Sequence, residues 1–109
     1  MKLARDFAAF KSVGAWVITH PDRDGYALVQ AHYGQSRVTV TVWDFERTGT
    51  PQTASANGGG YDRVTAALAG MTIGGHTLSD HCGLKAKGGY QTAGLDYLRE
   101  HGFSVIAAA

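Results

Sequence analysis

A run of strictly alternating side chains constrains the fold of this chain most. In the stretch "RVTVTVWDF", the valines at positions 38, 40 and 42 alternate with Thr39, Thr41 and Trp43. A period of two residues places alternate side chains on opposite faces of an extended strand, and β-branched residues favour that conformation. The run therefore predicts a strand with one apolar face of valines, directed at the core, and one mixed face.

Two similar runs precede this strand. They are "GAWVITH" (14–20) and "GYALVQAHY" (25–33), and the turn-rich stretches "PDRDG" (21–25) and "GQS" (34–36) separate the three runs. Proline and glycine favour tight turns, and connections this short join antiparallel neighbours. We therefore predict a three-stranded antiparallel meander.

Helical periodicity flanks the meander on both sides. Leu3, Phe7 and Phe10 recur at helical spacing and predict a helix of about ten residues that ends near Gly14. After a polar stretch (46–60) that we expect to be a long loop, an apolar stripe predicts a second helix from Tyr61, carried by Val64, Ala67, Leu68 and Met71.

The last third of the chain predicts a helix followed by a strand. "TAGLDYLREHGFSVIAA" carries Leu95 and Leu98 on a helix, Gly102 as its stop, and a final strand from Phe103 to Ala107. Between the two helices, "TLSDHC" (77–82) fits one short helical turn that ends at Gly83.

These elements predict a single domain over residues 1–109 in the α+β class. In this fold, a small antiparallel sheet, formed by the meander and the C-terminal strand, carries helices packed on one face. A composition of 44% hydrophobic and 17% charged residues agrees with one folded domain of this length.

Charge and cysteine content narrow the classes of function. The chain has 10 basic and 9 acidic residues, so it lacks the strongly basic balance of many nucleic-acid-binding domains. Cys82 is the single cysteine, which excludes an intramolecular disulfide. The first residues lack a continuous apolar run, so we expect neither a signal peptide nor a membrane span, and we predict a cytoplasmic protein with no membrane partner.

Three consecutive glycines, Gly58 to Gly60, precede the second predicted helix. A phosphate-binding loop would add Lys and Ser or Thr at fixed spacing, and neither is present. Asp62 in the first helical turn would also repel a phosphate. The remaining interpretations are a flexible entry into the helix and a loop that binds a partner.

The residues suited to metal binding or catalysis have unfavourable spacing. His76, His81 and Cys82 are metal-ligand types, but His81 and Cys82 are adjacent, and no second pair completes a tetrahedral set. Ser79 and Asp80 could join a distant histidine in a triad, yet no Gly-x-Ser-x-Gly motif accompanies them. We therefore predict no metal, no cofactor and no catalytic residue, and we keep a small hydrolase-type enzyme as a second alternative.

One basic and aromatic cluster favours a different alternative. "LKAKGGY" combines Lys85, Lys87 and Tyr90, and the predicted order α-β-β-β-α resembles that of double-stranded-RNA-binding domains. Those domains open their second helix with lysines, whereas Arg63 here stands beside Asp62. A small nucleic-acid-binding module with weak affinity is thus the first alternative function.

The stretch "NGGGYDRVTAALAG", Asn57 to Gly70, resembles a motif of small bacteriophage and prophage proteins. Proteins of that origin include inhibitors of host defence, anti-CRISPR proteins among them. The resemblance implies a non-enzymatic inhibitor that occludes a host protein complex such as a CRISPR effector. The partner-binding residues that we predict have side chains suited to interfaces, and they are Asn57, Tyr61, Arg63, Lys85, Lys87 and Tyr90.

Overall fold

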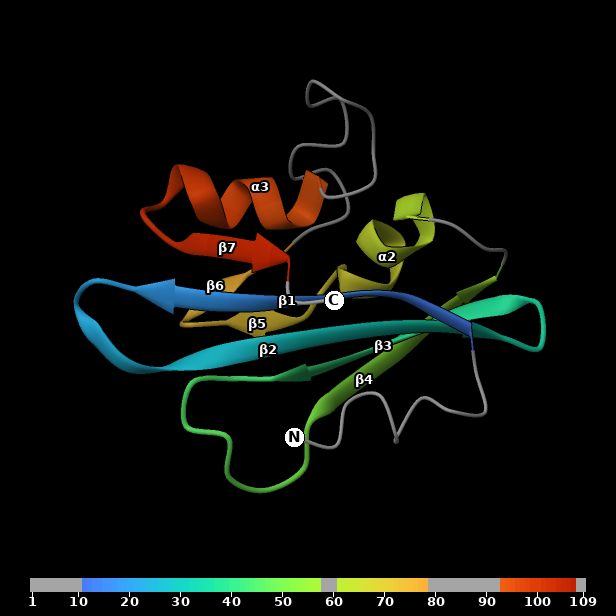
Figure 1. The fold of residues 1–109 in the computed structure, drawn as a ribbon, viewed down its shortest axis with the longest axis horizontal. Helices are drawn as coiled ribbons and strands as arrows, with labels where there is room; N and C mark the ends of the chain where they lie inside the picture. Colours follow the sequence, from blue (N-terminus) through green and yellow to red (C-terminus); the bar gives the residue numbers. More distant parts are fainter. Residues whose placement is uncertain (1–10, 58–60, 79–92, 108–109) are drawn as a thin grey trace.

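The computed structural model describes residues 11–57, 61–78 and 93–107. Along the chain its elements are β1 (Lys11–His20), β2 (Arg23–Gly34), β3 (Arg37–Trp43), β4 (Gln52–Asn57), α2 (Tyr61–Leu68), β5 (Thr72–Ile73), β6 (His76–Thr77), α3 (Ala93–Glu100) and β7 (Ser104–Ala107). Figure 1 shows their arrangement.

Five strands form one antiparallel sheet in the order β4-β3-β2-β1-β7. The predicted meander is confirmed, because β1 pairs with β2 and β2 pairs with β3. The predicted C-terminal strand is confirmed as β7, which pairs with β1 so that Trp16 lies opposite Ala107. The predicted helix stop is also confirmed, since α3 ends before Gly102, which has a φ of 92°.

The predicted α+β class is wrong. The described chain is mostly β, with one five-stranded antiparallel sheet, one small hairpin and only two helices of eight residues each. Three segments account for the difference. The predicted loop at 46–60 contains β4, the segment before Gly14 is already strand from Lys11, and the stretch after Met71 forms the β5–β6 hairpin.

Two predictions lie wholly or partly outside the described residues. They are the packing of Leu3, Phe7 and Phe10 and the helical turn at 77–82, of which the structure describes only the first two residues. Thr77 belongs to the short strand β6 rather than to a helical turn.

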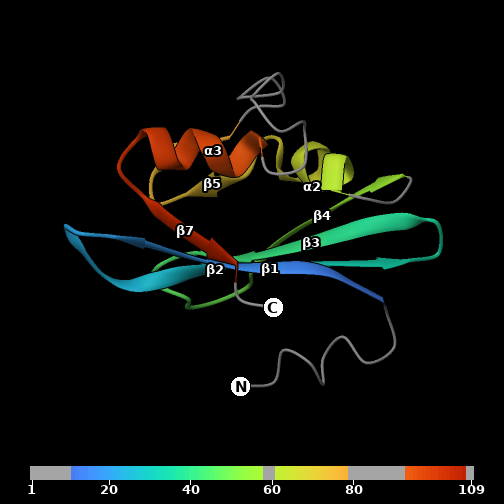
Figure 2. The ribbon, with the colours of Figure 1, turned by 45° about the horizontal axis from the view of Figure 1, so that its top comes forward.

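The valine face of β3 is the core face, as predicted. Val38, Val40 and Val42 are buried and share one apolar cluster with Val64 and Leu68 of α2. Figure 2 shows α2, α3 and the β5–β6 hairpin over the same face of the sheet. On the opposite face, the central strands also bury Ala15, Leu28 and Gln30.

Left-handed residues shape two of the hairpin turns. Gln35 and Ser36, between β2 and β3, have φ values of 56° and 61°. Gly74 and Gly75, between β5 and β6, have φ values of 59° and 86°. Positive φ at both central residues gives the turn whose twist matches that of paired strands. Glycine adopts this geometry freely, whereas Gln35 and Ser36 adopt it at a cost.

Candidate functional site

A polar cleft of about 330 Å³ opens at the end of β3 and under the loop that leads to β4. We call it the Trp43 cleft. Two segments supply almost its whole lining, the end of β3 with its loop and the start of β4, and Arg23 joins them from the start of β2. The lining residues are Arg23, Val42, Trp43, Asp44, Glu46, Arg47, Thr48, Thr50, Pro51 and Gln52.

Two polar side chains fix the walls of the cleft to the β5–β6 hairpin. Asp44 Oδ1 accepts hydrogen bonds from the backbone N–H groups of Phe45 and Gly74, both at 2.9 Å. The Gln52 amide donates to the carbonyl of Thr72 at 2.7 Å and accepts from the N–H of Thr72 at 2.9 Å. These side-chain bonds hold both ends of the β3–β4 loop, so the cleft has a preformed shape.

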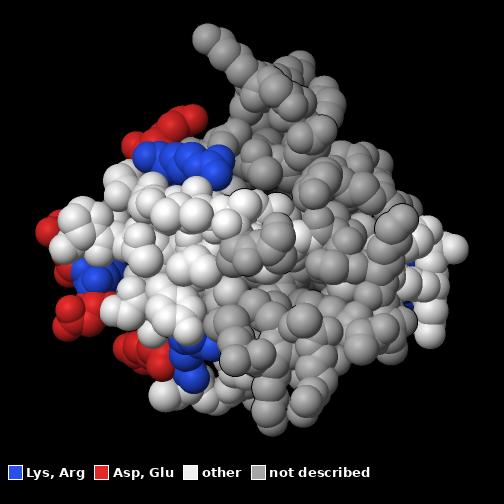
Figure 3. All heavy atoms as spheres, in the orientation of Figure 1, with Lys and Arg blue, Asp and Glu red and all other residues white. Residues whose placement is uncertain are grey.

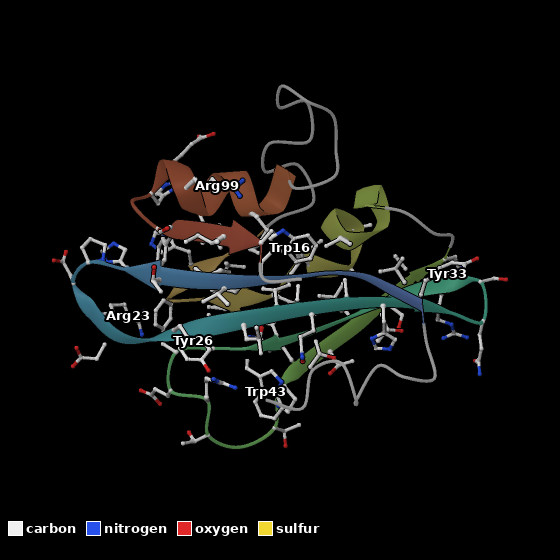
Figure 4. All side chains as sticks on the ribbon, viewed as in Figure 1. Trp16, Arg23, Tyr26, Tyr33, Trp43 and Arg99 are labelled. Carbon is white, nitrogen blue, oxygen red and sulfur yellow. The ribbon has the colours of Figure 1, made fainter. Side chains whose placement is uncertain are left out.

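Aromatic rings and guanidinium groups are paired around the cleft. Arg47 lies over the ring of Tyr26, with its Cζ atom 4.5 Å from the ring centroid. Arg23 lies over the ring of Phe45 at 4.3 Å. Figure 4 shows Tyr26 and Trp43 on the side of the sheet where the β3–β4 loop lies. Both arginines are exposed and Trp43 is half-buried, so these groups are accessible to a partner.

Arg47 also has an unusual backbone. Its φ is 52°, in the left-handed region that non-glycine residues rarely adopt, and Gly49 follows with a φ of 77°. Left-handed geometry at such a residue costs of the order of 1 kcal/mol or more. The loop thus holds Arg47 over Tyr26 in a backbone conformation that an arginine does not favour.

The lining carries two arginines, two carboxylates, two threonine hydroxyls and one tryptophan ring. None of the described residues that line the cleft is His, Cys, Ser or Lys, and Oδ1 of the Asp44 carboxylate accepts two backbone hydrogen bonds. Two arginines and two carboxylates line the cleft, so positive and negative side chains are equal in number there. Figure 3 shows acidic and basic atoms interspersed along this side of the molecule.

A second cluster gathers aromatic and imidazole rings beside the turn of the β5–β6 hairpin. The ring of His76 lies 5.1 Å from that of His101 and 5.4 Å from that of Phe103, and His20 lies 4.6 Å from Phe103. His101 Nδ1 is 2.8 Å from the carbonyl oxygen of Tyr97. These ring contacts join β1 and β6 to the segment between α3 and β7, and they pack these parts of the chain together. Within the described ranges, no group of three or more His, Cys, Asp or Glu residues is arranged to hold a metal ion.

One histidine has a shifted pKa. Burial of His32, on β2, lowers the pKa of its imidazole below the ordinary value of 6.5 because desolvation disfavours the charged form. His32 lies opposite Thr39 of β3, away from the Trp43 cleft.

Of the predicted partner-binding residues, only Asn57 has a side chain that the structure describes, and Asn57 does not line the Trp43 cleft. Asn57 is exposed at the far end of β4, opposite Arg37 of β3. Tyr61 and Arg63 belong to the first turn of α2, where the structure describes only their backbone. Lys85, Lys87 and Tyr90 lie outside the described residues, as do His81 and Cys82.

Sequence reasoning missed the cleft residues. Trp43 was visible only as part of the mixed face of a strand, and Arg47 only as part of a long loop. A stronger signal was the composition around the predicted strand ends, where Tyr26, Trp43 and Arg47 combine the residue types that dominate protein interfaces.

No helix in the described part of the chain is long and apolar enough to cross a membrane. Comparison with protein-family models, with curated proteins and with solved structures finds no match for this chain. The function proposed below therefore starts from the geometry of the site.

Proposed function

We propose that this protein is a non-enzymatic binding domain that recognises another protein through the Trp43 cleft and the adjacent ring of Tyr26. The observation that carries the proposal is a Trp, a Tyr and two Arg side chains gathered around one preformed, accessible cleft. Trp, Tyr and Arg are enriched among the few residues that contribute most of the binding energy in protein interfaces, and such residues cluster in well-packed pockets.

The charges of the cleft favour a protein partner over nucleic acid. Asp44 and Glu46 line it together with Arg23 and Arg47. Phosphate backbones are bound by basic surfaces, and neighbouring carboxylates oppose them. Mixed charges around an aromatic centre instead suit the side chains and backbone amides of a protein. Nucleic-acid binding at this cleft is the alternative that the experiment below also tests.

The specific form that we propose is an inhibitor of a host defence complex, such as a CRISPR effector, acting in the host cytoplasm. The resemblance of Asn57 to Gly70 to small phage proteins supports this form, and a lining without His, Cys, Ser or Lys agrees with stoichiometric occlusion. Asn57, Tyr61, Arg63, Lys85, Lys87 and Tyr90 remain proposed as further contacts of the same partner.

The test is affinity capture from a bacterial host lysate with the full chain as bait. Parent protein should recover one protein complex in near-stoichiometric amounts. Trp43→Ala and Arg47→Gly should each lose it, because truncating a central interface residue commonly costs more than about 2 kcal/mol of binding. A double variant at Tyr61 and Arg63 reports on the second proposed contact region.

Arg47→Gly is an informative variant because it should fold as well as the parent. Glycine relieves left-handed strain of the order of 1 kcal/mol, while the lost cation–π contact with Tyr26 is worth about 0.5–1 kcal/mol at an exposed site. An unchanged melting temperature with lost capture supports the proposal. Capture that survives both cleft variants, recovery of nucleic acid alone, or no recovery by the parent contradicts it.

A further inference from the structure

The two edges of the sheet differ in how open they are. β7 has four residues, and the Arg99 guanidinium of α3 donates to the carbonyl of Val105 at 3.1 Å, so a charged side chain occupies a backbone acceptor of that strand. β4, the other edge, has six residues, "QTASAN", with neither charge nor proline. Charged groups and prolines are the usual means by which sheet edges resist pairing, and β4 has none.

Within the part of the chain that the structure describes, the backbone of β4 pairs with one neighbouring strand only. This neighbour is β3, and the pairing covers all six residues of β4. Its side chains add a contact of 3.0 Å between the hydroxyls of Ser55 and Thr39, and the two bonds of Gln52 to Thr72. In an edge strand, alternate N–H and C=O groups point away from the paired neighbour. β4 therefore presents a row of backbone donors and acceptors about 20 Å long.

The side chains of β4 leave room for another strand. Thr53, Ser55 and Asn57 are exposed, and Ala54 and Ala56 are half-buried on the other face. All are short and uncharged. The side chains of β4 themselves therefore place neither a bulky group nor a charge along this edge.

The position of Gln52 connects this edge to the Trp43 cleft. Gln52 is the first residue of β4 and also lines the cleft, so a chain paired with β4 arrives at the cleft at its end. A second copy of this protein, paired through β4 alone, would bury less than the roughly 1,200 Å² that a stable interface needs. An extended segment of a different protein can occupy both the edge and the cleft.

We propose that the partner binds by strand addition: an extended, uncharged segment pairs with β4 as a sixth strand and places one side chain in the Trp43 cleft. This proposal rests on the proposed protein-binding function and states how the partner chain would bind. Main-chain hydrogen bonds along β4 supply affinity, and the cleft selects the side chain.

The experiment uses a phage-displayed library of random twelve-residue peptides, panned on the immobilised full chain. An enriched peptide is synthesised unmodified and in two N-methylated forms, which carry the methyl groups on alternate residues of opposite parity. In strand addition, only every second backbone N–H group of the peptide donates a hydrogen bond to β4, so only one of the two methylation patterns removes these donors. One form should lose at least tenfold in affinity by fluorescence anisotropy, and the other should stay within about twofold of the parent peptide. The β4 amides should gain protection from hydrogen exchange, and Trp43→Ala should weaken binding.

Three other outcomes would contradict strand addition. Equal effects of the two N-methylated forms without β4 protection would place the peptide elsewhere, and continued dependence on Trp43 would leave the proposed function standing. Concentration-dependent β4 protection in the protein alone would assign the edge to a second copy. An absence of enriched peptides would also reject strand addition, and the capture experiment would then decide the function separately.

Discussion

At the scale of single residues, Gly74 couples the hairpin to the cleft. Its N–H donates to Asp44. A Cβ atom at this position would lie 2.8 Å from Phe103 Cε2 and 3.1 Å from Arg23 Nη1, and φ is +59°. Gly74→Ala should lower the free energy of unfolding by about 2–4 kcal/mol, through left-handed strain and overpacking against a buried ring.

Gly75 offers a matched control for this prediction. Its φ is +86°, but a Cβ atom there would meet nothing within 4 Å. Gly75→Ala should therefore cost only the backbone strain, about 1–2 kcal/mol. Urea denaturation of both variants measures the difference, and equal losses would show that Phe103 does not restrict position 74.

His32 predicts a pH dependence at the same scale. Burial lowers the pKa of its imidazole in the folded protein below 6.5, so between the folded and unfolded pKa values the unfolded chain binds more protons. The contribution of His32 to stability is complete above pH 6.5 and is lost as the pH falls below it. Urea unfolding at pH 7.5 and 5.5 should show a smaller loss on acidification for His32→Gln than for the parent. An identical loss would contradict the shift.

At the scale of elements, the β2–β3 turn stores strain. Gln35 and Ser36 both have positive φ, in a turn that favours Asn followed by Gly. The double variant Gln35→Asn and Ser36→Gly should raise the free energy of unfolding by about 1 kcal/mol or more. Thermal melting measures this gain. A lower melting temperature would mean that the side chains of these two residues stabilise the turn.

The elements that sequence reasoning predicted are those whose pattern is local. The valines of β3 alternate perfectly, and Leu95, Leu98 and Gly102 mark a helix and its end. β4 was missed because its six small residues carry no apolar alternation, and its conformation depends on pairing with β3. The β5–β6 hairpin was missed although Gly74 and Gly75 between short runs are a known turn signal.

At the scale of the whole molecule, one core supports the fold. Val40, in the middle of β3, has no exposed surface, whereas its neighbour Thr41 lies on the half-exposed opposite face. Val40→Asp should unfold the protein by burying an unpaired charge, and Thr41→Asp should cost about 1 kcal/mol or less. Circular dichroism and thermal melting compare the two, and a folded Val40→Asp variant would remove β3 from the core.

The candidate site is formed by residues from three separate strands, and for this reason the sequence did not reveal it. Arg23 comes from the start of β2, Trp43 from the end of β3 and Gln52 from the start of β4. Only strand pairing and the bonds of Asp44 and Gln52 to the hairpin bring them together. No spacing within one segment encodes that geometry.

The pairing of β7 with β1 also has a consequence for how the protein folds. Nearly the whole described chain lies between Trp16 and its partner Ala107, so this contact closes a very long loop. The strands β1, β2 and β3 are close in sequence and can pair early. The pairing of β1 with β7 joins distant parts of the chain, and such non-local pairing slows folding. During synthesis on the ribosome, β1 remains a temporary sheet edge until Ser104–Ala107 has emerged, and in that interval the nascent protein is most exposed to wrong association.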